Sequence, residues 1–98
     1  MFVVRDVFHT KPGKAKELVT KFKTASPLLM SLGGIRDIRI MTDVVADYWT
    51  VVLEITVDDV GDYFSQNQKR AESAKMGEAM KGYMDLISHG HREIFKVE

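Results

Sequence analysis

Asp6 is the residue whose type and position most suggest chemistry. It lies in a strand-like run, where alternation places it on one face with Phe2, Val4 and Phe8. If that face packs beneath helices, Asp6 is a carboxylate in apolar surroundings, and such a group can act as a base or as a hydrogen-bond anchor. The alternative is that Asp6 caps a backbone group or reaches solvent at a sheet end. Asp6 is therefore the candidate catalytic residue, with a structural role left open.

Charged residues on neighbouring predicted strands form a second candidate group. Arg5 lies on the face opposite Asp6, and Glu54 lies on the mixed face of a later strand. These two strands are neighbours in the expected fold, so we expect Arg5 and Glu54 to pair. Asp37 and Arg39 could join them from the second strand along the chain. Buried charge pairs commonly fix register. We therefore interpret the four residues as a network that orders an interface between sheets, in preference to a reaction centre.

The three histidines invite comparison with a metal site. His89 and His91 are two residues apart, and His9 ends a strand expected to lie beside them. No carboxylate is evidently placed to complete a ligand set, and the spacing is not that of a zinc finger. We therefore predict no metal.

Methionine and aromatic side chains supply a candidate apolar pocket. Met76, Met80 and Met84 recur at helical spacing, and methionine either fills irregular core gaps or lines adaptable pockets. The sequence leaves both interpretations open. The residues expected to shape a substrate pocket are Phe8, Trp49, Phe64, Met80, Tyr83 and Met84.

The elements that must position these residues follow the order β-α-β-β-α-β, which is typical of the α+β ferredoxin-like fold, a four-stranded antiparallel sheet with helices on one face. Pro27 is expected to kink or restart the first helix, and Gly33-Gly34 to end it. Asp58-Asp59 is expected to cap the second helical region, and residues 65–68 to interrupt it. The expected strands are 2–8, 38–41, 48–57 and 93–97, and the expected helices are 15–29 and 69–87.

Length and composition limit the class of protein. The chain has 98 residues, no cysteine, and 14 basic against 14 acidic residues, so we expect one domain over residues 1–98 and no nucleic-acid partner. No apolar run approaches the length of a membrane span, and the N-terminus does not resemble a secretory signal. We therefore expect a soluble, cytoplasmic protein without a membrane partner. A chain of this length buries only about 60–65% of its unfolded surface, so we also expect a homodimer.

Several segments resemble the dimeric α+β barrel superfamily, in particular small members akin to the NIPSNAP and antibiotic-biosynthesis-monooxygenase branches. The resemblance implies two four-stranded sheets that face each other across a homodimer, with the helices outside. In that arrangement the mixed face of the third strand lines the barrel interior. The segments that carry the resemblance are Phe2-Val3-Val4-Arg5, Pro12-Gly13-Lys14-Ala15, Arg39-Ile40-Met41-Thr42-Asp43, Trp49-Thr50-Val51-Val52-Leu53-Glu54 and Gly90-His91-Arg92-Glu93-Ile94-Phe95.

The resemblance also implies functions. Some relatives are cofactor-free oxygenases of aromatic, polyketide-like substrates. Others degrade haem with an asparagine on strand one and a tryptophan and a histidine on the second helix. Asp6 stands at the asparagine position, Phe64 near the tryptophan and Ala74 near the histidine, and no histidine lies in residues 58–87. We therefore predict no haem degradation and no cofactor.

The favoured function is the binding of a small hydrophobic or aromatic molecule, with cofactor-independent monooxygenation as the candidate activity. The alternative is a non-catalytic dimeric binding or interaction module with a filled core.

Overall fold

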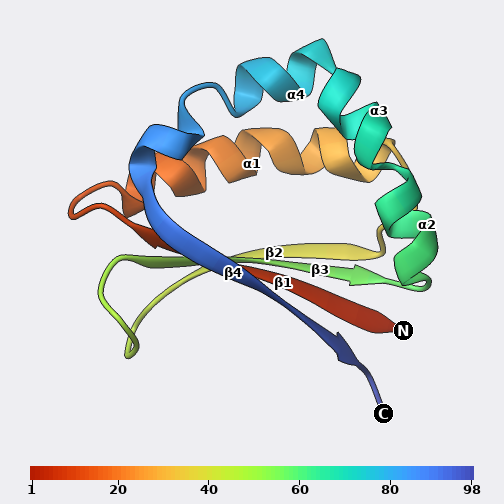
Figure 1. Ribbon diagram of the computed structural model, residues 1–98, viewed down its shortest axis with the longest axis horizontal. Helices are drawn as coiled ribbons and strands as arrows, with labels where there is room; N and C mark the ends of the chain where they lie inside the picture. The colour runs from red at the N-terminus through yellow and green to blue at the C-terminus, as the bar shows by residue number, and fades with distance from the viewer.

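The computed structural model describes residues 1–98 as a four-stranded antiparallel sheet with helices on one face (Figure 1). The strand order is β2-β3-β1-β4, so β1 lies inside the sheet between β3 and β4. This architecture confirms the predicted α+β ferredoxin-like fold. The strands are β1 (Phe2–Thr10), β2 (Asp37–Thr42), β3 (Thr50–Val57) and β4 (Ile87–Lys96), and the helices are α1 (Ala15–Ser31), α2 (Val60–Ser65), α3 (Asn67–Glu72), α4 (Ala74–Ala79) and the 3₁₀ turn η1 (Tyr83–Leu86).

The hydrophobic core lies between the sheet and the helices. Alternation along β3 predicts its inward face correctly, because Val51, Ile55 and Val57 are almost fully buried there. Val4 of β1 and Leu18 of α1 complete the centre of this core at 0% exposure. Removing each such side chain from water contributes about 1.5–3 kcal/mol to folding. The helix-covered face is therefore the principal source of stability within one chain.

Helix α1 runs through Pro27 without an interruption, so the helix does not restart there. Proline lacks the N–H that would bond to the carbonyl four residues earlier. Pro27 is exposed, and the hydroxyl of Ser26 donates to the Phe22 carbonyl oxygen at 2.7 Å in the same turn. The helix ends as predicted before Gly33 and Gly34, whose φ angles of 84° and 80° suit glycine.

The second helical region is broken, whereas the sequence pattern predicts one long helix over residues 69–87. Asp59 caps α2 by accepting from the Asp62 N–H at 3.0 Å, and the expected interruption occurs at Gln66, between α2 and α3. A second break occurs at Ser73, whose backbone is extended and whose hydroxyl accepts from the Met76 N–H. The methionines therefore lie on two short elements and a turn, not on one stripe.

The last strand begins at Ile87, six residues before the expected start at Glu93, because β4 pairs with β1 along its whole length. Tyr48 and Trp49 lie in the β2–β3 loop and not in β3.

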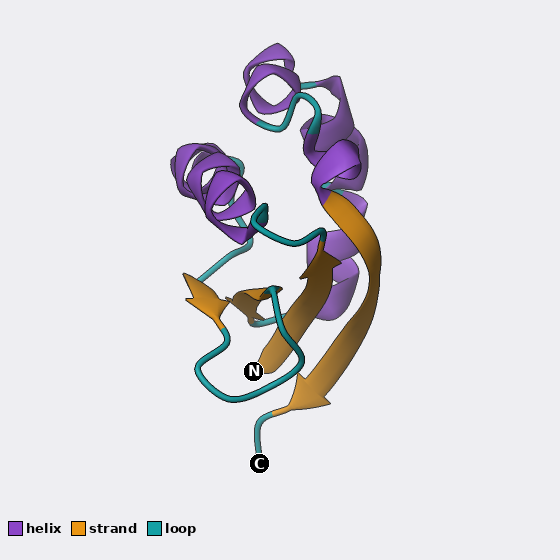
Figure 2. Ribbon diagram, turned by 90° about the vertical axis from the view of Figure 1, so that its left-hand side faces the viewer, coloured by secondary structure: helices purple, strands orange, loops and turns teal.

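All helices lie on one side of the sheet, and no element of the chain covers its other face, here called the open face (Figure 2). The molecule measures 36 × 35 × 18 Å.

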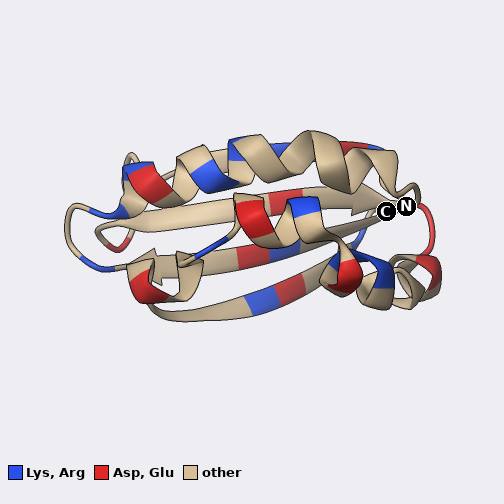
Figure 3. Cartoon of the chain, turned by 90° about the horizontal axis from the view of Figure 1, so that it is seen from above, with Lys and Arg blue, Asp and Glu red and all other residues tan.

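Charges of both signs are interspersed along the helices and strands (Figure 3). None of the helices combines the length and the hydropathy needed to cross a lipid bilayer.

Candidate functional site

Asp6 forms an ion pair with Arg92, its cross-strand neighbour on β4. Arg92 donates from Nε to Oδ1 at 2.6 Å and from Nη2 to Oδ2 at 3.3 Å. The hydrogen bond to Asp6 is the main reason that the pKa of Arg92 is raised above its ordinary value. The Asp6 side chain is only 14% exposed. Because both its oxygens are occupied, Asp6 is held as an anchored acceptor, and a substrate must compete with Arg92 to use it as a base.

Helix α2 closes one side of this ion pair. The guanidinium of Arg92 lies 5.5 Å from the centre of the Phe64 ring, and the Phe64 ring meets that of Tyr63 edge-on at 5.3 Å. Burial raises the pKa of the Tyr63 hydroxyl, so Tyr63 is neutral in this cluster. The guanidinium of Arg70 stacks on the Tyr63 ring, 4.3 Å from its centre. Two arginines and two aromatic rings thus fix the surroundings of Asp6.

A groove of about 520 Å³ opens beside the ion pair, between η1 and the strands β1 and β4. Four of the predicted site residues line it: Asp6, Phe8, Tyr83 and Met84. Its wall also includes Gly90, where a Cβ atom would lie 2.8 Å from the Val7 carbonyl oxygen. The close approach of β4 to β1 therefore requires glycine at this position. The groove combines aromatic and aliphatic surface with a charged pair at one side.

The remaining predicted pocket residues do not join this groove. Met80 packs against the core, and Phe64 contacts Tyr63 and Arg92. Trp49 lines a different pocket, between the β2–β3 loop and α1. The residues of the single apolar pocket predicted from the sequence are thus found in four places: the Asp6 groove, the core, the contact of Phe64 with Arg92, and the Trp49 pocket. Arg92 is the site residue that the sequence analysis missed.

The second candidate group lies on the open face and is centred on Glu54. Arg5 donates to Oε1 of Glu54 at 2.8 Å, and Arg39 lies 2.5 Å from Oε2. The expected pairing of Arg5 with Glu54 is present, and Arg39 joins it. Hydrogen bonding from Arg5, aided by the Arg39 charge, holds the pKa of Glu54 below its ordinary value although burial acts in the opposite direction. Glu54 is only 5% exposed, even though no helix covers this face.

The membership of this network differs from the prediction at one position. Asp37 is exposed and forms no ion pair. Glu93 of β4 takes part instead, with Oε2 3.9 Å from Arg5 Nη1, and the Arg5 guanidinium lies 5.6 Å from the centre of the Phe95 ring. Glu93 and Phe95 alternate within the predicted strand 93–97, but the register that places Glu93 opposite Arg5 comes from the pairing of β4 with β1.

A shallow depression of about 470 Å³ lies on the open face beneath the β2–β3 loop, with Val7, Met41 and Val52 on its floor. His9 stacks on His89 at its side, with ring centres 4.3 Å apart. His91 Nε2 lies 3.1 Å from Oε1 of Glu93. The structure contains no group of three histidine, cysteine, aspartate or glutamate side chains placed to hold a metal ion.

Neither a family model nor a curated protein matches the sequence. Solved structures do match the fold. An uncharacterized NIPSNAP domain protein from Burkholderia xenovorans superposes with a TM-score of 0.83 at 14% identity, over 100% of this chain and 95% of that one. A NIPSNAP family protein from Agrobacterium tumefaciens gives a TM-score of 0.80 at 14% identity, over 99% and 92% of the two chains.

A putative antibiotic biosynthesis monooxygenase from Nitrosomonas europaea gives a TM-score of 0.77 at 13% identity, over 99% of this chain and 98% of that one. These similarities show a ferredoxin-like fold shared with NIPSNAP domain and monooxygenase-like proteins.

Proposed function

We propose that this chain forms a homodimer through its open face and binds a small hydrophobic or aromatic molecule in the groove beside Asp6 and Arg92. The observation that carries the binding proposal is the groove itself, in which apolar side chains meet a fixed ion pair. Ligand sites generally combine apolar walls with a few placed polar groups.

The open face has the composition of an interface. Glu54 is buried between two arginines, and Val7, Met41 and Val52 lie beside it. Pairing two such faces would remove the aliphatic floor from water. The charged network would then set the register between the sheets.

The ligand chemistry follows from the groove walls. Phe8, Tyr83 and Met84 offer surface to a planar apolar ring, while Asp6 and Arg92 offer an acceptor and a donor side by side. An aromatic molecule with a hydroxyl or an enolisable carbonyl satisfies both kinds of surface. The guanidinium stabilises negative charge that develops on the ligand oxygen.

The second candidate function is cofactor-independent monooxygenation of that ligand. It is favoured by the fold shared with the putative monooxygenase and by the place of Asp6 on the groove wall. Asp6 would accept the proton of an acidic C–H group, and Arg92 would stabilise the resulting anion. The anion would reduce O₂, with one oxygen atom entering the product as a carbonyl and the other leaving as water. Without turnover, the same groove would serve a non-catalytic binding protein.

The test is a thermal-shift screen of hydroxylated polycyclic aromatics, with oxygen consumption measured for each compound that binds. A ligand at 100 times its Kd stabilises the native state by about 2.7 kcal/mol. Arg92→Gln should abolish the shift, while Arg36→Gln, at an exposed ion pair outside the groove, should leave it unchanged. An equal shift in the Arg92→Gln variant would contradict binding at this groove. Binding without oxygen uptake would support the non-catalytic protein.

A further inference from the structure

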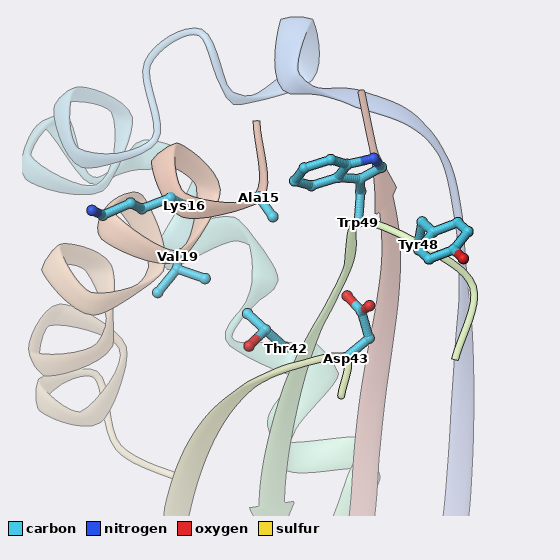
Figure 4. A pocket seen from close by; sticks show the side chains of 7 residues that line it. All are labelled: Ala15, Lys16, Val19, Thr42, Asp43, Tyr48 and Trp49. Atoms are coloured by element: carbon cyan, nitrogen blue, oxygen red, sulfur yellow. The ribbon is translucent and has the colours of Figure 1, made fainter. Parts of the chain in front are cut away.

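A second pocket, of about 530 Å³, lies at the β2 side of the sheet, whereas the Asp6 groove lies at the β4 side. The β2–β3 loop and the first turns of α1 form it. Figure 4 shows the indole of Trp49 and the carboxylate of Asp43 on one side, with Ala15 and Val19 on the other. None of the residues of this pocket lines the Asp6 groove.

Trp49 is held in a backbone conformation that bulky residues rarely adopt. Its φ of 63° makes it the only non-glycine residue with positive φ. The conformation is fixed because the Trp49 carbonyl oxygen accepts from both the N–H and the hydroxyl of Thr10, each at 2.9 Å. The side chain nevertheless remains 44% exposed. Core packing does not account for this arrangement, and strained residues cluster at binding sites.

Asp43 places an unpaired carboxylate beside this indole. Its Oδ1 accepts from the Thr50 N–H at 2.9 Å, which fixes the side chain, while Oδ2 has no partner in the chain. No lysine or arginine forms an ion pair with Asp43, since the salt bridges of the chain involve other carboxylates. Lys16 contributes only its aliphatic stem, because its ammonium group points away from the pocket (Figure 4).

We propose that this pocket binds an organic ammonium ion. The charged nitrogen would lie between the Asp43 carboxylate and the indole of Trp49, with its alkyl groups against Ala15 and Val19. A carboxylate gives a charge-assisted contact, and the face of an indole is the most favourable aromatic surface for a cation. A neutral ligand of the same shape would cover Asp43 without compensating its lost hydration. Charge is therefore the basis of selectivity at this site, which shares no residue with the Asp6 groove, while Thr42 and Asp43 also border the depression on the open face.

The experiment uses Trp49 as its own reporter, because it is the only tryptophan in the chain. Choline and its neutral isostere 3,3-dimethylbutan-1-ol are titrated while tryptophan emission is recorded. We expect a saturable change with choline and at least about tenfold weaker binding of the isostere, because only choline carries the positive charge that the Asp43 carboxylate and the indole face attract. Equal binding of the two probes, or no saturable change with choline up to about 100 mM, a concentration that even weak millimolar binding would saturate, would overturn the proposal.

Matched variants locate the effect. Asp43→Asn keeps the oxygen that accepts from Thr50 and removes only the charge, so choline affinity should fall at least about tenfold while the isostere is unaffected. Asp47→Asn makes the same charge change in the same loop, outside this pocket, and should bind choline normally. Equal losses in both variants would show general electrostatic attraction and overturn the site. If Asp43→Asn does not fold, the comparison of the two probes on the unaltered chain decides the question.

Discussion

The two faces of the sheet bury their side chains by different means. The helix-covered face is apolar at its centre, where Val4, Leu18 and Ile55 are almost fully buried, and its ion pair of Asp6 with Arg92 lies toward the β4 edge. The open face buries a charge at its centre, because Arg5 and Arg39 enclose Glu54 without any covering element.

This difference suggests that one face stabilises the fold of a single chain and that the other determines the geometry of its association. An apolar core gains free energy from burial without demanding one orientation, whereas a buried ion pair contributes little net stability and restricts geometry. We therefore expect the helix-covered face to maintain the fold of one chain. We expect the open face to determine how that chain pairs.

The largest effect should come from the helix-covered face. Leu18→Ala removes a side chain that is 0% exposed, and it should lower the free energy of unfolding by about 3–5 kcal/mol through lost burial and the remaining cavity. Urea denaturation followed by circular dichroism measures this change. Leu28→Ala, a partly buried position on the same helix, is the matched control and should cost less. Equal losses would mean that the centre of the core lies elsewhere.

The next effect should appear in association and not in folding. Val52→Asp places a carboxylate on the floor of the open face, and a symmetric dimer would bury it twice. We expect the Kd of the dimer to rise at least about 100-fold, because charges are costly to bury without a partner. Light scattering coupled to size exclusion measures the change across a concentration series.

The control for this prediction is Met30→Asp, which adds the same charge at an exposed position on α1. It should leave the association state unchanged. A single-chain mass for the unaltered protein at micromolar concentration would refute the dimer.

A smaller, pH-dependent effect should come from Glu54. Its pKa in the folded chain lies below the ordinary value of 4.5, so the ionised form stabilises the fold above about pH 4.5, and this contribution is lost as pH falls through the folded pKa. Glu54→Gln should cost about 1–2 kcal/mol at pH 7. The difference from the unaltered protein in denaturation experiments should shrink below pH 4.5. A difference that is constant from pH 7 to pH 3 would exclude this origin.

The smallest effect should come from an ion pair that neither face buries. Arg36 Nε lies 2.7 Å from Asp58 Oδ1, but the two side chains are 61% and 67% exposed. Asp58→Asn should change the free energy of unfolding by no more than about 0.5 kcal/mol, since solvent screens exposed pairs. A loss as large as that of Glu54→Gln would show that burial is not what distinguishes the two pairs.

Alternation and element order were sufficient to predict the fold. The inward face of β3 and the contact between Arg5 and Glu54 follow from counting residues along strands, because side chains alternate with a period of two. The break at Ser73 could not be predicted from local periodicity, because the helical pattern of side chains continues across it although the backbone is extended there. The left-handed backbone of Trp49 could not be predicted from periodicity either, because it depends on hydrogen bonds from Thr10, a residue distant in the sequence.

The candidate site was less predictable because its key contact depends on register. Asp6 stood out by its place among apolar neighbours, but its partner Arg92 lies one residue before the predicted start of the last strand. Extending that strand to Ile87 places Arg92 opposite Asp6. An error in one strand boundary therefore hid the ion pair. The functional roles of Asp6 and of the pocket residues remain predictions.

The inner position of β1 also affects how the chain folds during synthesis. Phe2 pairs with Val57 on one side and with Lys96 on the other, so β1, the earliest of the four strands in the sequence, gains its second neighbour only when β4 is present. Pairings this distant in sequence form slowly and leave strand edges exposed in the meantime. The nascent chain therefore carries an apolar strand with at least one free edge until β4 has been synthesised, and this is the interval in which we expect chaperones to bind it.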